Sequence, residues 1–223
     1  MLDRVLEPEA MDTEDEANDY DAMDHSAVNR AFAADFFSVF PAVLNPVLDV
    51  GTGTAQIPIE LCRQSPAVQI VAVDLSEAML KLASRNVTTA GFAGRITLER
   101  VNGRDLPYPA GRFGAVVSNS IIHHIPEPTA CFAEMVRVCR LGGTLFVRDL
   151  LRPAMREELD RLVNLHAAGA NDSQRALFAN SLRAALTLDE VRSIVRGLGF
   201  DGEAARQTSD RHWTFAATKP GSS

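Results

Sequence analysis

The sequence lacks the features that mark several classes of protein, so these classes can be excluded. Only three of its 223 residues are cysteine, Cys62, Cys131 and Cys139, and their spacing matches no metal or redox motif. We expect reduced, buried thiols, as in a cytoplasmic protein, and no disulfide framework. No apolar run has the length of a membrane-spanning helix, and the acidic N-terminus lacks the basic flank and apolar stretch of a signal peptide.

Positive charge is also scarce. Lysine and arginine total 22 against 29 acidic residues, a net charge of -7. No broad positive field is available to attract a phosphate backbone, so we expect a small-molecule substrate and no nucleic-acid or membrane partner. With 46% hydrophobic residues, the chain can bury one sizeable core, which predicts a single domain.

Short β-rich runs alternate with stretches of helical periodicity. Strands separated by helices imply right-handed crossovers and a mostly parallel sheet covered on both faces, an α/β fold. The segment "EAARQTSDRHWTFAAT" predicts a C-terminal antiparallel hairpin around a polar turn at Ser209 and Asp210. The predicted core strands are 47–50, 70–74, 96–101, 115–119 and 144–150.

Helical segments flank this core on both sides. Helices that precede or interrupt an open sheet commonly lie over the carboxyl edge where ligands bind, so we expect them to form a lid. The predicted organisation is N-terminal lid helices at 1–44, the ligand-binding core at 45–150, a helical insertion near the active site at 151–190, and the last helix with the hairpin at 191–219.

The turn after the first strand, "VLDVGTGTAQ", is a near match to a dinucleotide-binding fingerprint. Gly51 and Gly53 allow a ligand to approach the backbone closely. The third glycine that a nicotinamide fingerprint requires is replaced by Gln56. A ligand without a pyrophosphate does not need that glycine, so the turn favours a nucleoside over a dinucleotide.

An acidic residue follows at the distance typical of a ribose contact. Asp74 ends the second predicted strand, 21 positions after Gly53 (74 − 53). A carboxylate there accepts hydrogen bonds from both ribose hydroxyls. The alternative role for Asp74 is a helix cap, which the neighbouring Ser76 is placed to take instead.

With these residues the sequence resembles the class I S-adenosylmethionine-dependent methyltransferases. Their first motif, an acidic residue followed by G-x-G-x-G, stands here as Asp49, Gly51 and Gly53, with Ala55 in place of the last glycine. The resemblance continues through "VAVDLSEAML", "LPYPAGRFGAVVSNSIIHHI" and "EMVRVCRLGGTLFV", and covers residues 45–150. It implies a Rossmann-like, mostly parallel seven-stranded sheet and S-adenosyl-L-methionine as cofactor.

The resemblance also implies which residues contact the cofactor. The glycine turn and Asp49 would face its amino-acid part, Asp74 its ribose, and Leu75 and Met79 its adenine. Asn102 stands where the family usually has an acidic residue reading the adenine edge, and Gly114 where aspartate is commoner. The full predicted cofactor set is Asp49, Gly51, Thr52, Gly53, Asp74, Leu75, Met79, Asn102, Gly103, Ser118 and Tyr20.

Methyl transfer from a sulfonium depends on alignment and exclusion of water, so the sequence needs no strong catalytic signature. The stretch "SNSIIHHIPEP" places Asn119 and His124 near the ligand edge. Two roles are open for His124: a base for an acceptor proton, or packing with its neighbour against the following helix. "NSIIHH" also differs from the N-P-P-[YF] motif of nucleobase and glutamine amino methylases.

The stretch "RDLLRP" brings Asp149 and Arg152 to the same predicted edge. Asp149 is a candidate to orient or deprotonate an acceptor, and Arg152 to bind a substrate carboxylate or phosphate. An Asp–Arg pair that fixes the turn is the alternative. The catalytic set is thus His124, Asp149 and Asn119.

Four residues complete the predicted lid and acceptor pocket. Tyr20 is placed to lie against the cofactor sulfonium by cation–π attraction. The predicted substrate and lid residues are Met23, His25, Asn29 and Arg152.

No metal is expected, because adjacent histidines such as His123 and His124 tend to point apart. Three rival functions remain: an enzyme that uses the cofactor without methyl transfer, a non-catalytic binding module, and a nicotinamide oxidoreductase. The last conflicts with Gln56 and with the absence of a Tyr-x-x-x-Lys pattern. The acceptor, the atom methylated and the oligomeric state are not encoded in any motif.

Overall fold

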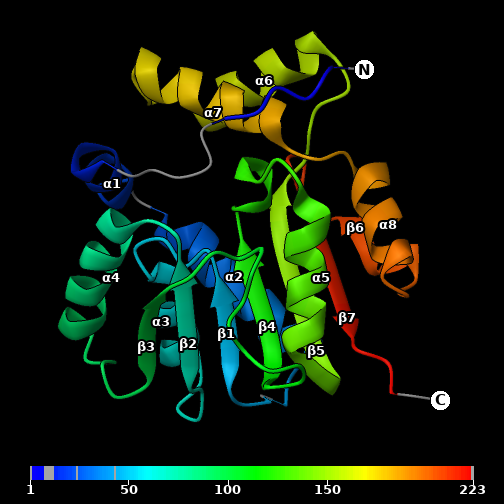
Figure 1. Ribbon diagram of the computed structural model, residues 1–223. Helices are drawn as coiled ribbons and strands as arrows, with labels where there is room; N and C mark the ends of the chain where they lie inside the picture. The colour runs from blue at the N-terminus through cyan, green and yellow to red at the C-terminus, as the bar shows by residue number, and fades with distance from the viewer. Residues whose placement is uncertain (1, 8–12, 24, 43, 222–223) are drawn as a thin grey trace. The chain divides into compact units, whose positions relative to one another are not determined.

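The computed structural model describes the chain apart from residues 1, 8–12, 24, 43 and 222–223 (Figure 1). The chain forms two compact units. The first, here called the sheet unit, comprises Ala10–Asn119, Ala130–Val147 and Ala216–Ser223. The second, here called the helical unit, comprises Met1–Glu9, Ser120–Thr129 and Arg148–Phe215. The predicted lid at 1–44 is therefore divided, because its first residues belong with the C-terminal helices, and its residues 1, 8–12, 24 and 43 lie outside the described part.

Seven strands form one sheet, which confirms the predicted fold class. Their order is β3-β2-β1-β4-β5-β7-β6. β1 pairs in parallel with β2 and β4, β2 pairs in parallel with β3, and β6 and β7 are antiparallel. The strands are β1 (Val47–Val50), β2 (Ile70–Asp74), β3 (Ile96–Arg100), β4 (Phe113–Asn119), β5 (Cys139–Leu150), β6 (Ala205–Gln207) and β7 (His212–Thr218).

Helices follow β1, β2, β4 and β5 in the chain, as predicted, whereas β3 leads to β4 without a helix. The insertion predicted at 151–190 contains α6 and α7, and the last helix starts before the predicted boundary because Thr187 and Glu190 form a capping box. The helices are α1 (Glu14–Asp21), α2 (Ser26–Val39), α3 (Gln56–Gln64), α4 (Glu77–Thr89), α5 (Pro128–Val138), α6 (Arg156–His166), α7 (Asp172–Ala184) and α8 (Leu188–Gly197), with 3-10 turns η1 (Ile122–His124) and η2 (Gly202–Ala204).

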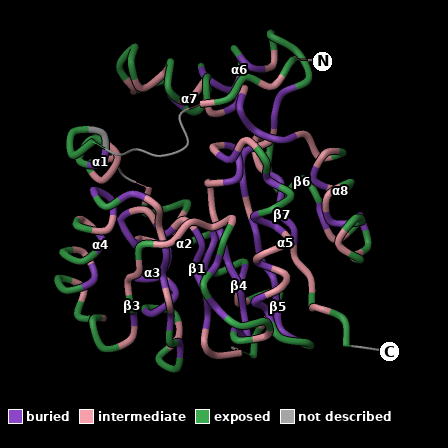
Figure 2. Tube along the Cα trace, viewed as in Figure 1, coloured by how far each residue is buried: buried purple, intermediate pink, exposed green. Residues whose placement is uncertain are grey.

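The central strands are continuous apolar runs because they are buried on both faces in the core of the sheet unit. All four residues of β1 and the first six of β4 are buried, as Figure 2 shows along both strands. Both faces of the sheet are covered, since α2 and α3 lie behind β1 and β2 in Figure 1 and α5 lies in front of β5. Phe32 and Phe36 of α2 pack edge-on against Phe146, at ring centroid distances of 5.1 and 5.7 Å.

The strand predicted at 144–150 begins earlier in the structure. α5 ends at Val138, and β5 starts at Cys139 and runs through the glycine pair at 142–143. Gly143 is required there, because a Cβ would lie 2.8 Å from Arg140 O and from Gly114 O. Within the described residues no helix is long and apolar enough to span a membrane, and all three cysteines are free and buried.

The helical unit has its own core, formed by buried residues of α6, α7 and the end of β5. The N-terminal segment is fixed to it by the backbone, where Leu2 N donates to Ala154 O at 3.0 Å and Val5 N to Arg183 O at 3.2 Å. Leu2 also packs against this core. The first residues of the chain are therefore an integral part of this unit.

Candidate functional site

The turn between β1 and α3 is held tightly against β2. Gly51 N and Thr52 N both donate to Val73 O, at 2.8 and 2.9 Å. Gly51 and Gly53 have φ of 75° and 54°, a region that residues with a side chain rarely adopt. The two glycines therefore serve the turn conformation as well as ligand approach.

Ala55 has the same backbone constraint without being glycine. Its φ is 64°, it precedes the first residue of α3, and its side chain is fully buried in the core of the sheet unit. The left-handed conformation explains why a glycine is usual at this position in the family that the motif resembles. The alanine retains the fold at the expense of local strain.

Three buried side-chain oxygens on this turn lack a hydrogen-bond partner among the described residues. They are Asp49 Oδ2, Thr52 Oγ1 and Thr54 Oγ1. Burial raises the pKa of the Asp49 carboxyl from 3.8 to about 7, and the negative charge of Asp74 contributes to the rise. Buried polar atoms without partners are rare in proteins, and here they fit a polar ligand such as the ammonium of an amino acid.

Asp74, at the end of β2, bridges the two strand ends. Its Oδ2 accepts from Gly53 N at 2.7 Å and its Oδ1 from Ser76 N at 2.9 Å. Ser76 is the N-cap of α4, since its hydroxyl accepts from Met79 N at 3.2 Å. Asp74 is thus a residue of the glycine turn and not the cap of α4; Leu75, half-buried, follows it in the chain.

The predicted lid residue Tyr20 lies at the glycine turn. Its Cε1 is 4.0 Å from the point where a Cβ on Gly53 would lie, and its ring is 5.0 Å from the His25 ring. Burial raises the pKa of the Tyr20 hydroxyl. Tyr20 also packs with Met79 against Ala17 and Ala78, so that α1 is seated on α4.

Ion pairs and hydrogen bonds hold α1 to α4. Asp21 accepts from Arg85 at 3.1 Å and from Asn86 at 2.8 Å. The other predicted lid residues, Met23 and Asn29, are half-buried, in the α1–α2 connection and in the first turn of α2. The tyrosine is therefore fixed to a helix that the sheet unit itself supports.

Three other predicted cofactor residues have structural duties. Ser118 is fully buried and donates to Val50 O at 2.8 Å, so it ties β4 to β1. Asn102 Oδ1 accepts from Arg104 N at 2.9 Å and from Arg104 Nε at 3.5 Å. A Cβ on Gly103 would lie 3.0 Å from Val50 Cγ1, so packing requires this glycine. Asn119, the last residue of β4, is half-buried.

In the helical unit, Asp149 and His123 form a buried pair that the sequence reasoning missed. His123 Nδ1 lies 2.6 Å from Asp149 Oδ1, and Asp149 Oδ2 accepts from Ile122 N at 2.5 Å and His123 N at 3.2 Å. Burial alone would lower the pKa of His123, but the Asp149 carboxylate raises it above its ordinary value. The charge of His123 likewise lowers the pKa of Asp149 against the effect of burial.

Asp149 is engaged by groups of the protein. Its side chain is 1% exposed and its oxygens accept hydrogen bonds from η1 and Leu150 N, so it orients His123. Arg152 donates to Ala185 O at 3.0 Å and to Glu190 Oε1 at 2.7 Å, while its Nε has no partner among the described residues. The pair anticipated between Asp149 and Arg152 is replaced by these two separate pairs.

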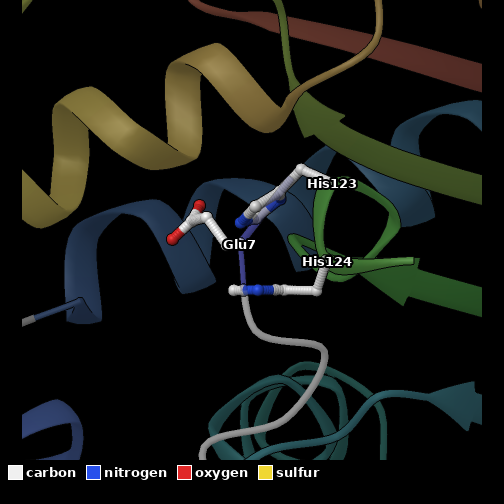
Figure 3. Close-up of side chains that lie close together, drawn as sticks. All are labelled: Glu7, His123 and His124. Carbon is white, nitrogen blue, oxygen red and sulfur yellow. The ribbon is translucent and has the colours of Figure 1, made fainter. Parts of the chain in front are cut away.

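The two histidines of η1 do not point apart. Their ring centroids are 4.1 Å apart with planes inclined at 37°, within the 3-10 turn η1. Both rings extend toward Glu7 of the N-terminal segment (Figure 3). The reason for expecting no metal here is therefore wrong. Ser120, with φ of 58°, starts this loop in a conformation that marks strain.

Comparison with known proteins finds similarity to methyltransferases. A family profile described as a methyltransferase domain matches residues 48–147. The chain is 36% identical over 111 residues to the ubiquinone/menaquinone biosynthesis C-methyltransferase UbiE of Geobacter sulfurreducens, which covers 49% of this chain and 43% of that protein. It is 27% identical over 177 residues to 27-O-demethylrifamycin SV methyltransferase of Amycolatopsis mediterranei, covering 78% and 61%.

A solved structure agrees over nearly the whole length. It belongs to a Methanococcus maripaludis protein assigned to the S-adenosyl-L-methionine-dependent methyltransferases, with a TM-score of 0.73, 16% identity, and coverage of 98% of this chain and 99% of that one. This likeness concerns the fold, while the chain spans less than two thirds of the curated relatives above. Residues 48–147 therefore carry a methyltransferase domain, and the motifs and strand order resemble those of the class I S-adenosylmethionine-dependent methyltransferases.

Proposed function

We propose that this protein transfers the methyl group of S-adenosylmethionine to a small-molecule acceptor. The observation that carries the proposal is the glycine turn, where the buried Asp49 Oδ2 and Thr54 Oγ1 lack partners beneath a lid tyrosine. A ligand with an ammonium and a ribose satisfies this set, whereas a dinucleotide has no phosphate-binding glycine at Gln56.

The residues of the turn would hold the cofactor as follows. Asp49 would accept a hydrogen bond from the cofactor's ammonium. The Asp74 carboxylate would accept hydrogen bonds from the ribose hydroxyls, and its hydrogen bond from Gly53 N would weaken. Leu75 and Met79 would contact the adenine, and Tyr20 would cover the amino-acid end. When bound, the cofactor supplies an activated methyl group whose leaving thioether is neutral.

The chain's own contribution to catalysis is then mainly alignment and exclusion of water. Tyr20 can exclude water from the cofactor because the helix that carries it, α1, is anchored on α4. An aromatic ring near the sulfonium also adds cation–π attraction, which is strongest where water is excluded.

An acceptor that must lose a proton needs a base, and we assign this role to His124. It stands five residues after the end of β4 (124 − 119), is half-buried, and is packed against the His123 ring that Asp149 holds in place. Imidazole titrates near neutral pH, as a base for this purpose should. Asp149 and His123 act as positioning residues.

The acceptor is proposed to be a small organic molecule. One relative is named as a C-methyltransferase of ubiquinone and menaquinone biosynthesis, and the other as a methyltransferase of 27-O-demethylrifamycin SV. These names include both carbon and oxygen as the methylated atom. The acidic net charge of -7 supports a small acceptor over a nucleic acid.

The test is a product assay with methyl-labelled S-adenosylmethionine and a panel that includes a demethylmenaquinone and a demethylated rifamycin. Formation of S-adenosylhomocysteine together with a labelled acceptor supports the proposal. Methylthioadenosine as the product would replace it with elimination or cyclisation chemistry. Tight cofactor binding with no turnover across the panel would favour a binding module.

His124→Asn is the informative variant in this assay, with His166→Asn as its matched control. His166 lies in the same unit but pairs with Asp210 at 2.8 Å. We expect His124→Asn to lower the rate by about 10²-fold or more for a hydroxyl acceptor, and to leave cofactor affinity unchanged. Equal rates in the two variants would remove His124 from the mechanism.

A further inference from the structure

We propose that Glu7, His123 and His124 form a binding site for a divalent first-row transition metal ion. Each of the three residues offers one ligand atom, and these atoms lie within 4.8 Å of one another. Figure 3 shows both imidazole rings directed at the segment that carries Glu7. No requirement of methyl transfer accounts for a carboxylate at this position.

Glu7 is brought to the histidines by Arg4. The Arg4 guanidinium donates to Ala184 O at 2.7 Å and to Ile125 O at 3.0 Å, and it also reaches Pro126 O and His123 O. One side chain thus ties the N-terminal segment both to the end of α7 and to the histidine loop. Since Glu7 follows Arg4 by three residues, its position next to η1 is fixed by the same contacts.

The carboxylate of Glu7 is only partly satisfied within the protein. It has a side-chain hydrogen bond with Ser181, but its Oε1 is buried and has no hydrogen-bond partner in the part of the chain that the structure describes. Burial also raises the pKa of this carboxyl group. A buried carboxylate oxygen without a partner carries a free-energy penalty that a bound cation would remove.

His123 is oriented as metal-binding histidines usually are. Its Nδ1 is occupied by Asp149 at 2.6 Å, so the nitrogen available for a ligand is Nε2. A carboxylate behind the imidazole fixes the tautomer and increases the basicity of the other nitrogen, which is the common arrangement in zinc sites. Asp149 therefore supports the proposed site without contacting the ion.

The local charge suits a cation. The carboxylates of Glu7 and Asp149 face His123 together with the single guanidinium of Arg4, while His124 is neutral when it binds a metal. Zinc bonds to nitrogen and oxygen are about 2.0–2.2 Å long, so two ligands of one ion lie at most about 4.3 Å apart. The three ligand atoms lie within 4.8 Å of one another, so binding an ion would draw them closer together.

Two imidazole nitrogens and one carboxylate oxygen select the kind of ion. This set binds Zn²⁺, Fe²⁺ and neighbouring metals and leaves at least one coordination position open. Ca²⁺ and Mg²⁺ require oxygen ligands instead. A His124 nitrogen that binds a metal cannot accept a proton at the same time, so coordination and the base role proposed above exclude each other in one molecule.

The experiment measures metal binding directly. The full chain is stripped with a chelator and titrated with Zn²⁺ against a chromophoric competitor, in parallel with Glu7→Gln, His124→Asn and the control His166→Asn. Thermal unfolding and a titration with S-adenosylhomocysteine accompany each variant, so that loss of folding or of the cofactor site is distinguished from loss of the metal.

We expect one Zn²⁺ per chain in the wild type and in His166→Asn, with binding at least tenfold weaker in Glu7→Gln and no saturable site in His124→Asn. Bound Zn²⁺ should also raise the unfolding temperature of the wild type and of His166→Asn, in which the site is intact, but not that of His124→Asn. Co²⁺ in place of Zn²⁺ should give a visible absorption band that Glu7→Gln alters. If His124→Asn does not fold, the affinity of Glu7→Gln for Zn²⁺ tests the proposal. No saturable binding by the wild type, or equal affinity in Glu7→Gln, would overturn the proposal while leaving cofactor binding intact.

Discussion

The carboxylate of Asp74 accepts a hydrogen bond from the backbone N–H of Gly53 at 2.7 Å, and so joins the end of β2 to the turn after β1. The residue that is expected to hold the ribose thus already organises the glycine turn. Cofactor binding and the shape of the turn are coupled through one side chain. Variants of the turn should therefore change both the stability of the protein and its affinity for the cofactor.

Asp49→Asn should stabilise the free protein. The pKa of Asp49 in the folded protein, about 7, is above its ordinary value of 3.8. The protonated carboxyl therefore contributes fully to folding stability below pH 3.8, and this contribution is lost as the pH rises through 7. The full difference is at most about 4 kcal/mol. We expect the variant's advantage to grow by at least about 1 kcal/mol between pH 4 and pH 7.5, as measured by urea unfolding, and then to stay constant. An advantage that shrinks with pH would contradict the assignment.

The affinity for S-adenosylhomocysteine should depend on the same group. The cofactor ammonium favours the ionised form of Asp49, which is a minor species at pH 6 and the major one at pH 8. We expect binding to be up to about tenfold tighter at pH 8 than at pH 6 in calorimetric titrations. In Asp49→Asn the affinity should be at least tenfold weaker and nearly independent of pH, while Asp74, the neighbouring charge, is unchanged. A parallel pH dependence in both proteins would assign it to another group.

Ala55→Gly should have little effect on stability. Glycine would relieve the left-handed conformation, worth about 1–2 kcal/mol. It would also remove a buried methyl group, about 0.8 kcal/mol, and increase the entropy of the unfolded chain by about 0.4–1 kcal/mol. The expected net change is within about 1 kcal/mol in urea unfolding. The control is Ala83→Gly in α4, equally buried but helical, which should be clearly destabilising. Equal losses in the two variants would mean that Ala55 is not strained.

Asp149→Asn should destabilise the protein in a pH-dependent way. The pKa of His123 is raised, so its contribution is complete below about 6.5 and is lost as the pH rises through the folded value. The pKa of Asp149 is lowered, so its contribution is lost only in acid. Glu7, Arg4 and His124 also face this pair and remain in the variant. We expect a loss of about 3–5 kcal/mol at pH 6.5 and a smaller loss at pH 9 in urea unfolding.

The second aspartate–histidine pair provides the control for this variant. Asp210 and His166 are 2.8 Å apart but more exposed, so Asp210→Asn should change stability by less than about 1 kcal/mol. The same penalty for Asp149→Asn at pH 6.5 and pH 9 would show that the imidazolium charge does not contribute.

The core of the fold was predictable because its signals are local. β1 and β2 begin and end where the apolar runs 47–50 and 70–74 do, and Ser76 caps α4 as its position before the helix indicated. The antiparallel pairing of β6 and β7 followed from one polar turn. These features depend on neighbouring residues in the chain and require no knowledge of tertiary packing.

Features set by distant contacts were missed. Gly114, where aspartate is commoner in the family, cannot carry a side chain here because a Cβ would lie 2.2 Å from Leu44 O. The Asp149–His123 pair spans 26 residues, and Arg4 reaches carbonyls more than 100 residues away. A buried aspartate at a strand end was recognisable as polar, but whether it faced a ligand or another loop depended on the packing of the helical unit.

The central claim is that the glycine turn binds S-adenosylmethionine through Asp74. The most direct measurement is a calorimetric titration of the wild type, Asp74→Ala and the control Glu77→Ala with S-adenosylhomocysteine, and separately with NAD. Glu77 is an exposed acidic residue three positions away, paired with Arg100. We expect micromolar binding of S-adenosylhomocysteine by the wild type and Glu77→Ala, weakened at least tenfold, or about 1.4 kcal/mol, in Asp74→Ala, and no heat from NAD. Heat from NAD alone, with no response to S-adenosylhomocysteine, would contradict the account.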